Sequence, residues 1–183
     1  MDQWWRKVSS KHSDYQRLAP DYFTYLNTNP PDCKEMNDIM LFNLQNDLTG
    51  RGITTFEHQG RTDRISGKTF YIRAQGNPKL YWASDNGEVF ASETARTRFR
   101  IRIDGDQMGV VMIDDDFIII EAATDSSKQI GAGDDGKVHL GGHSCRLRLR
   151  DLQTSFLAEV TSQNREPTVK KISGAGEAWE LVD

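Results

Sequence analysis

The stretch Arg98-Phe-Arg-Ile-Arg-Ile-Asp104 alternates arginine with apolar residues until it reaches the aspartate. Because successive side chains of a β-strand point to opposite faces, this pattern predicts a strand with an arginine face and an apolar face. Nearly the same pattern returns in Cys145-Arg-Leu-Arg-Leu-Arg-Asp151, and a weaker form is Ala178-Trp-Glu-Leu-Val-Asp183. Three related strands, each leading to an aspartate, predict a β fold that is built from an internal repeat.

The region that starts at Ile53 has the composition of a β domain. Its β-branched and aromatic residues alternate with polar ones, and turn residues recur at short intervals, most clearly in Asp85-Asn-Gly87, Asp104-Gly-Asp106 and Asp134-Asp-Gly136. No long helical pattern interrupts it, which excludes a parallel α/β sheet. Strands are expected near residues 53–57, 69–74, 79–84, 88–92, 97–104, 109–113, 117–123, 137–140, 145–151, 155–161, 168–173 and 178–182.

A first helix is predicted before this region, over residues 2–19. Trp4, Val8 and Leu18 belong to a set of apolar residues that recur at roughly helical spacing, with charged residues between them. Pro20 ends the run because proline cannot continue a helix. Two roles are open for the aromatic stripe, namely packing on the β domain or docking to a partner.

A second helix is predicted over residues 32–48. Asp32 stands where an N-cap belongs, a glutamate follows three residues later, and apolar residues then recur at helical spacing. Gly50 comes just after the predicted end, where a C-terminal glycine is favoured. The predicted organisation is therefore a helical N-terminal segment over residues 1–50 and an all-β domain over residues 53–183.

Composition limits the classes of partner and the compartment. The formal net charge of −4 is mild, so the chain as a whole is not expected to bind nucleic acid or a membrane surface. No apolar run approaches the roughly 20 residues that span a bilayer, and residues 1–6 contain no apolar core of a secretory signal. Cys33 and Cys145 are the only cysteines, so no disulfide framework is expected. These features predict a cytoplasmic protein, with a mature secreted chain as the alternative.

One part of the chain resembles a unit of a β-trefoil. Leu80-Tyr-Trp-Ala-Ser-Asp-Asn-Gly-Glu-Val-Phe90, a polar turn and Arg98-Phe-Arg-Ile-Arg-Ile103 are similar in their order to units of fascin-like and ricin-B-like domains. A second unit that resembles them comprises Phe156-Leu-Ala-Glu-Val160, Thr168-Val-Lys-Lys-Ile172 and Gly176-Glu-Ala-Trp-Glu-Leu181.

The resemblance implies a third, middle unit over residues 117–151 and a β-trefoil over about residues 53–183. The three closing strands are not evenly spaced along the chain, which departs from a regular trefoil. A β-sandwich or an irregular barrel fits the same number of strands and is the alternative fold.

The arginine-rich strands are the first candidate site. Rows of guanidinium groups suit sulfate, phosphate or carboxylate, which they hold by paired hydrogen bonds. The alternative is a solvated outer face whose arginines pair across strands with carboxylates such as Glu121. The candidate ligand-binding residues are Arg100, Arg102, Arg146 and Arg148.

The turn that follows the first aromatic pair is the second candidate site. Tyr81 and Trp82 precede Asp85 and Asn86, and an aromatic ring beside an aspartate suits the binding of a sugar or another polyol. Strand alternation also predicts that one of the two aromatic residues lies in the core.

Metal binding and catalysis find little support. His139, His143 and Cys145 lie close together but lack a fourth zinc ligand, and the acidic turns lack the spacing of an EF-hand. No Gly-x-Ser-x-Gly, Walker loop or His-Glu-x-x-His motif occurs. We therefore expect no metal, no cofactor and no enzymatic activity, and an unrecognised small hydrolase that uses Cys145 or His143 stays as an alternative.

The most direct functional prediction is non-catalytic recognition. By the resemblance, the ligand is a carbohydrate or an acidic glycan, bound through loops and arginine-rich strands. The alternative from the same resemblance is an acidic protein partner such as actin, as in fascin-like modules. The arginines favour an acidic ligand in either case.

Overall fold

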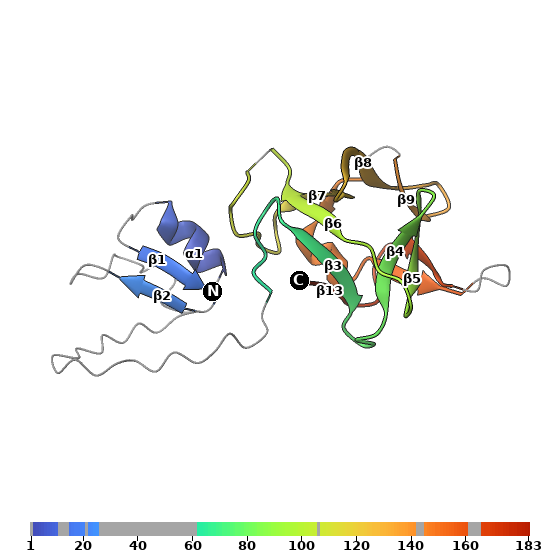
Figure 1. Ribbon diagram of the computed structural model, residues 1–183, viewed down its shortest axis with the longest axis horizontal. Helices are drawn as coiled ribbons and strands as arrows, with labels where there is room; N and C mark the ends of the chain where they lie inside the picture. The colour runs from blue at the N-terminus through green and yellow to red at the C-terminus, as the bar shows by residue number, and fades with distance from the viewer. Residues whose placement is uncertain are drawn as a thin grey trace. The chain divides into compact units, whose positions relative to one another are not determined.

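The computed structural model describes residues 2–10, 15–20, 22–25, 62–105, 107–141, 145–160 and 166–183. The chain forms two compact units, Met1–Asp63 and Arg64–Asp183 (Figure 1). The described residues are mainly β, which confirms the predicted fold class at that level. None of their helices is long and apolar enough to cross a membrane. The predicted helix over 32–48 and the predicted strand near 53–57 lie outside the described residues.

The first unit begins with one short helix. Helix α1 (Asp2–Ser9) buries Trp4 and Val8, which lie one turn apart on the same face. Strands β1 (Tyr15–Ala19) and β2 (Tyr22–Tyr25) then form an antiparallel pair. The helix predicted over residues 2–19 is therefore wrong beyond Ser9. Backbone pairing of β1 with β2 satisfies the same N–H and C=O groups that a helix would use, so the tertiary partner decides the structure.

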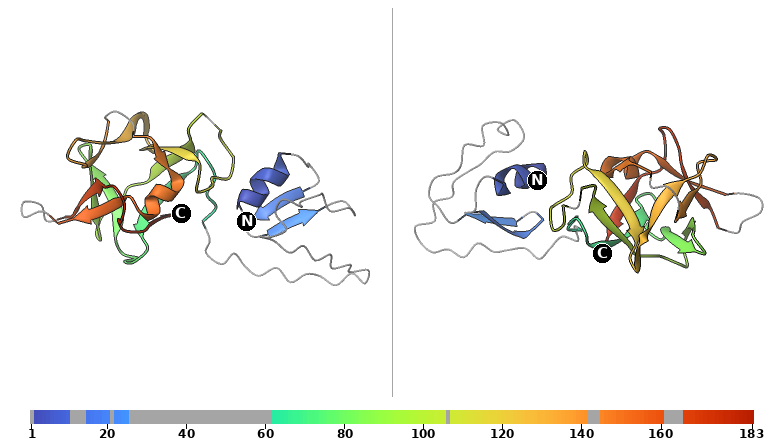
Figure 2. Two further views of the ribbon diagram at one scale, coloured as in Figure 1. Left: turned by 180° about the vertical axis from the view of Figure 1, so that it is seen from behind. Right: turned by 90° about the horizontal axis from the view of Figure 1, so that it is seen from above.

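Seven strands of the second unit form a closed antiparallel barrel (Figure 1, Figure 2). The chain supplies two meanders, β3-β4-β5 and β6-β7-β8-β9, which are joined by the β3–β6 and β5–β9 pairings. A closed barrel has no unpaired edges, which protects it from edge-to-edge association. The barrel strands are β3 (Thr69–Ala74), β4 (Tyr81–Asp85), β5 (Glu88–Ser92), β6 (Phe99–Ile103), β7 (Phe117–Ala122), β8 (Asp125–Ala132) and β9 (Val138–Leu140).

Four further strands pack onto this barrel. β10 (Leu147–Arg148) pairs with β7, and β13 (Trp179–Val182) pairs with β3. β11 (Phe156–Glu159) pairs with β12 (Thr168–Lys171), which also pairs with β5. The second arginine strand, predicted over 145–151, stops early, because a 3₁₀ helix η2 (Leu149–Gln153) follows β10 directly.

Two local features explain this early stop. The Asp151 carboxylate accepts a hydrogen bond from the backbone N–H of Arg148 at 2.7 Å, which closes a helical turn. The same turn buries Leu149 and Leu152 against the core. The free energy gained by burying two leucine side chains favours the turn over a longer strand.

Two other strand predictions need correction. The strand predicted near 109–113 is reduced to a single bridge between Ile65 and Val111. Strand β8 was not predicted, because its first half, Asp125-Ser-Ser-Lys128, is polar and mostly exposed. The pairing of Asp125 with Ala122 of β7 starts the strand, and β9 pairs with its apolar second half, Ile130–Ala132.

An aromatic cluster fills the centre of the barrel. The Trp82 ring meets those of Phe99, Phe156 and Trp179 edge to face, with centroid distances of 6.4, 5.0 and 5.7 Å. All four side chains have 0% exposure. Such pairs contribute roughly 0.5–1.5 kcal/mol each beyond the burial of their area. Trp82 of β4 therefore contacts aromatic residues of three other strands, β6, β11 and β13.

The second unit contains three related segments. Each segment has three buried residues at equivalent positions, one on its first strand, one on its hairpin and one on its last strand. The spacing of these three residues along the chain is the same in the first two segments, and the third segment is shorter. Strand β3 pairs with β6 and β7 pairs with β10 within the segments, while β6 pairs with β7 and β13 pairs with β3 between them. The equivalent core residues are Phe70, Trp82 and Phe99, then Ile118, Ile130 and Leu147, then Phe156, Val169 and Trp179.

The hairpins of the three segments meet at one junction. The bridging pairs are Glu88↔His139, Phe90↔Thr168 and Lys137↔Lys170. The β8–β9 turn needs a glycine there, because Gly136 has φ +79° and a Cβ would lie 2.8 Å from the Lys171 carbonyl oxygen. The Lys171 N–H donates to the Gly136 carbonyl at 2.8 Å, which fixes the second hairpin against β12.

Candidate binding surface

The two arginine-bearing strands lie on either side of the same strand. β6 and β10 both pair with β7, and the register places Arg102 opposite Ile119 and Arg148 opposite Phe117. The sequence left open whether the two arginine sets are neighbours, and the pairing brings them together. We call the outward side chains of this region the arginine face: Tyr71, Arg96, Arg98, Arg100, Arg102, Phe117, Ile119, Glu121, Arg146 and Arg148.

Tyrosine rings hold the first arginines of this face. The Arg96 guanidinium lies 4.5 Å from the Tyr71 ring centroid and 5.6 Å from that of Tyr81. Arg98 lies 4.7 Å from Tyr71, and its hydrogen bond to the phenol oxygen lowers the pKa of Tyr71. Among the described residues neither arginine forms an ion pair with a carboxylate. Cation–π stacking positions these charges but leaves them available to an anion.

A phenylalanine plays the same part on the other side of β7. The guanidinium groups of Arg146 and Arg148 lie 3.8 and 4.8 Å from the Phe117 ring centroid. Asp115 is 3.4 Å from Arg148 and 2.9 Å from Arg150, so these two charges are partly neutralised. Arg146 is exposed and has no carboxylate partner within the described part of the chain.

The centre of the arginine face serves the fold. Glu121 is only 2% exposed, and its Oε2 lies 3.5 Å from Arg102 Nε. The contact is an ion pair without hydrogen-bond geometry, since Oε2 makes no hydrogen bond. Arg100 donates to the Ala123 carbonyl at 3.5 Å. The interpretation of a paired outer face is therefore confirmed for Arg102, and the available charges lie at the two ends.

The predicted polyol site is not assembled. Trp82 has 0% exposure and lies in the core, so its ring cannot stack on a ligand, and this part of the prediction is wrong. Tyr81 points to the opposite side of β4 and contacts the Tyr71 ring at 6.1 Å. Asp85 and Asn86 stay in the exposed hairpin turn, where the Asn86 amide donates to the Asp85 carboxylate at 3.2 Å.

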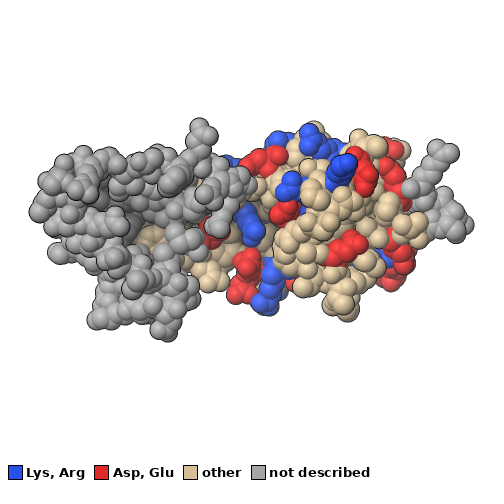
Figure 3. Space-filling model, turned by 90° about the horizontal axis from the view of Figure 1, so that it is seen from below, with Lys and Arg blue, Asp and Glu red and all other residues tan. Residues whose placement is uncertain are grey.

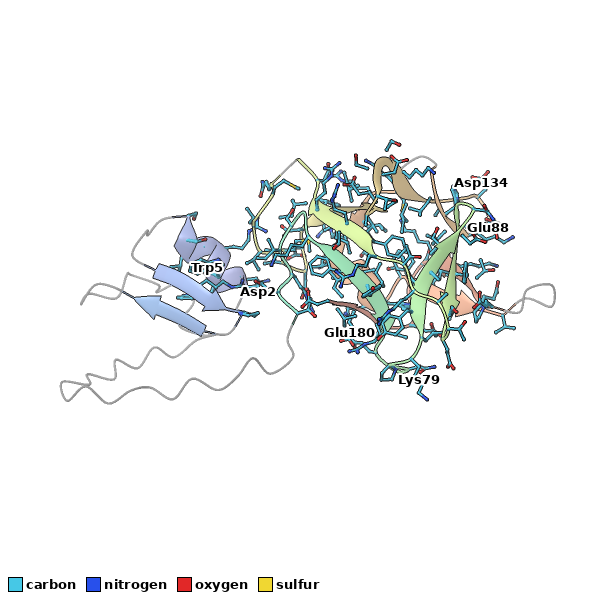
Figure 4. All side chains as sticks on the ribbon, in the orientation of Figure 1. Asp2, Trp5, Lys79, Glu88, Asp134 and Glu180 are labelled. Atoms are coloured by element: carbon cyan, nitrogen blue, oxygen red, sulfur yellow. The ribbon has the colours of Figure 1, made fainter. Side chains whose placement is uncertain are left out.

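A pocket that the sequence does not predict lies at the hairpin junction. Its volume is about 720 Å³, within the usual range for small-molecule sites. Figure 4 places Glu88 and Asp134, on neighbouring hairpins, at the same end of the second unit. The sequence predicted the turns at residues 85–87 and 134–136, but no local pattern reports that these two turns lie beside β12. The lining residues are Glu88, Val89, Phe90, Gly133, Asp135, Lys137, Val138, His139, Glu166 and Thr168.

His139 and Cys145, which the sequence places close together, have different surroundings in the structure. His139 lines the pocket, and its Nδ1 lies 3.3 Å from the Lys137 carbonyl oxygen. The half-buried Cys145 thiol is directed at the Ile130 carbonyl at 3.8 Å, and burial raises its pKa. His143 lies outside the described residues. Within the described ranges, no three His, Cys, Asp or Glu side chains are grouped to hold a metal ion.

Basic and acidic side chains are interspersed on the face of the molecule in Figure 3, in line with the mild net charge. Any charge selectivity must therefore come from local groups such as the ends of the arginine face.

No family model matches this chain, and no match was found among the curated proteins or the solved structures. The geometry of the described residues carries the functional argument.

Proposed function

We propose that this chain is a non-catalytic binding module whose arginine face recognises an acidic glycan. The observation that carries the proposal is that the charges of Arg96, Arg98 and Arg146 are available to a ligand. Their guanidinium groups stack on aromatic rings and have no carboxylate partner among the described residues. They flank β7 on both sides, so an elongated polyanion can contact both ends of the face.

The chemistry of the face suits sulfated or carboxylated sugars. A guanidinium group offers a planar pair of donors that matches sulfate and carboxylate oxygens. Stacking on Tyr71 and Phe117 restricts the arginine side chains before binding, which lowers the entropy that binding must overcome. The partly exposed rings of Phe117 and Tyr71 also offer apolar area to the C–H faces of sugar rings.

We also propose that the second unit is a β-trefoil with a shortened third segment. Its support is the repeated pairing of first and last strands in two segments, the link between β13 and β3, and the mutual contact of three hairpins. The equivalent core positions repeat in the same order.

An acidic protein surface, with actin as the example from fascin-like modules, is the second candidate ligand. The observation that favours it is the pair of partly exposed apolar residues between the arginines, Phe117 and Ile119. Apolar and arginine side chains together are typical of the energetic centres of protein interfaces. A protein ligand would depend on Ile119, whereas a sulfated glycan would depend chiefly on the arginines.

The test compares binding of a sulfated glycan with that of the same backbone after desulfation, at low and moderate salt. We expect binding only to the sulfated form, with affinity falling as salt rises. The double variant Arg96→Ala/Arg98→Ala and the variant Arg146→Ala should each weaken binding about tenfold or more, since hydrogen bonds to charged groups contribute roughly 1.5–3 kcal/mol. Arg150→Ala is the matched control, because Arg150 already pairs with Asp115 at 2.9 Å.

Equal losses in Arg150→Ala and Arg146→Ala would show a non-specific charge effect and contradict the site. Binding that survives both test variants would also contradict it. A loss caused by Ile119→Ser, together with indifference to sulfation, would transfer the assignment to a protein partner.

A further inference from the structure

The floor of the hairpin-junction pocket is the outward face of strand β5. Val89 and Ala91 point into the core, so Glu88, Phe90 and Ser92 point the other way. Neighbouring strands flank this floor, since Glu88 pairs with a residue of β9 and Phe90 with a residue of β12. The side chains of this strand are therefore held by backbone pairing on both sides and do not depend on a loop.

The far end of the floor carries a fixed carboxylate. The Ser92 hydroxyl donates to Glu166 Oε1 at 2.5 Å. The same hydroxyl oxygen accepts the backbone N–H groups of Thr94 and Ala95 at 3.1 and 3.0 Å, so its proton is directed to Glu166. Glu166 is half-buried, lines the pocket and forms no ion pair with a described residue. The serine hydrogen bond orients its carboxylate, and no cation of the described residues neutralises it.

The near end of the floor carries a second available carboxylate. Glu88 lines the pocket and also has no ion pair among the described residues. Lys137, the one lysine among the described lining residues, lies 3.5 Å from Asp135 and pairs with that carboxylate. Hydrogen bonding from the Lys137 backbone lowers the pKa of Asp135, so this carboxyl group is ionised at neutral pH. Among the described residues, the pocket therefore has two carboxylates without a cationic partner, Glu88 and Glu166.

The distance between these two carboxylates determines the length of ligand that the pocket can bind. Glu88 and Ser92 are four residues apart on a regular strand, so roughly 13 Å separates the two ends of the floor. Phe90 lies midway and is half-buried, with its side chain in the pocket lining. An extended ligand with a cationic group at each end and an apolar middle matches this order of carboxylate, phenyl ring and carboxylate.

We propose that the hairpin-junction pocket binds an elongated organic dication, with one ammonium group at Glu88, the other at Glu166 and the methylene chain over Phe90. A free polyamine and a peptide with two lysine side chains share this chemistry. The phenyl face adds a cation–π contribution for a charge near the middle of the chain. This site shares no residue with the arginine face and has the opposite charge, so it extends the proposed function to a second ligand.

Titration calorimetry with spermidine and with α,ω-diamines of increasing length tests the proposal on the whole chain. We expect affinity to rise with the distance between the two amines, to reach a maximum near the span of the floor, and to fall again for longer chains. Neutral sugars and monoamines of the same length should bind more weakly than the best diamine, by up to about fivefold for each ion pair lost, since an exposed ion pair contributes up to roughly 1 kcal/mol.

Three variants then locate the ligand. Glu88→Gln and Glu166→Gln should each weaken binding of the best diamine about two- to fivefold and abolish the length optimum. Lys137→Met should leave affinity equal or improve it, because a like charge leaves the pocket. Asp134→Asn is the matched control, since it removes one charge from the adjacent turn without lining the pocket.

The outcomes separate the two sources and can overturn the proposal. Tighter binding of a Lys-Gly-Gly-Lys peptide than of spermidine would identify a peptide ligand, and the reverse would identify a polyamine. Equal losses in Asp134→Asn and Glu88→Gln would reduce the effect to net charge and overturn the site. Affinity without a length dependence, preference for a neutral sugar, or no binding of any diamine would do the same.

Discussion

The first and second segments of the barrel carry the same arginine pattern but surround it differently. Arg98 and Arg146 occupy equivalent positions, immediately before the buried residue that starts the closing strand. Arg98 rests on Tyr71, whereas Arg146 rests on Phe117. In the second segment the exposed Asp115 pairs with Arg148 and Arg150, whereas the carboxylate that pairs with Arg102 of the first segment is the buried Glu121. Equivalent positions in a repeat therefore fix where an arginine points, while unrelated neighbours decide whether its charge is available.

The largest expected effect comes from the core that both segments share. Trp82→Ala removes the ring that contacts three other aromatic rings, and it should lower the free energy of unfolding by about 3–5 kcal/mol. Tyr81→Ala should change stability far less, because Tyr81 lies on the outer side of the same strand. Urea denaturation of both variants measures the difference. Equal losses would mean that Trp82 is not the central packing residue.

The second effect concerns the buried carboxylate between the segments. Arg102→Met leaves Glu121, which is 2% exposed, without its ion-pair partner at 3.5 Å. We expect a loss of about 3 kcal/mol, because an uncompensated buried charge is costly. The double variant Arg102→Met/Glu121→Gln should regain most of that loss, and Arg100→Met should cost less than about 1 kcal/mol. A double variant that is as unstable as Arg102→Met would contradict the pairing.

The sequence predicted most of the second unit because its signals are local. Strict alternation around Phe99 and the Asp-Asn-Gly turn at 85–87 require no distant partner, and both β6 and the β4–β5 hairpin are found. The helix predicted over residues 2–19 is found only as Asp2–Ser9, because the pairing of β1 with β2 is a tertiary effect that periodicity cannot report.

The same distinction between local signals and distant contacts applies to the candidate binding surface. Alternation correctly placed the arginines outward, because side-chain direction on a strand is a local property. It could not place β6 and β10 on the two sides of β7, nor bring Glu166 beside Ser92, because residues far apart in the sequence make these contacts. The Trp82 error has a different cause, since alternation predicted one buried aromatic residue of the pair without saying which.

A third, smaller effect tests the difference in carboxylates between the two segments. Asp115→Asn removes the partner of Arg148 and Arg150, so the second segment gains available positive charge. We expect binding of a sulfated glycan to strengthen about two- to fivefold at low salt, since exposed ion pairs are worth up to roughly 1 kcal/mol. Asp134→Asn makes the same change of net charge away from the arginine face and should have no comparable effect. Equal gains in both variants would show that net charge alone controls binding.

The smallest effect sharpens the contrast between Tyr71 and Phe117, the rings under the two arginine sets. The hydrogen bond from Arg98, together with the charge of Arg96, holds the pKa of Tyr71 below its ordinary value, so the folded state favours the ionised phenol. Its contribution to stability is therefore absent near neutral pH, and it appears as the pH rises through the lowered pKa. Arg98→Ala should return the Tyr71 pKa toward that of a free tyrosine, which ultraviolet titration against a Tyr71→Phe reference measures. The first segment would then lose its alkaline pH dependence and resemble the second, in which Phe117 cannot ionise. A Tyr71 titration that is unchanged in Arg98→Ala would show that stacking, without the hydrogen bond, is the contact that positions Arg98.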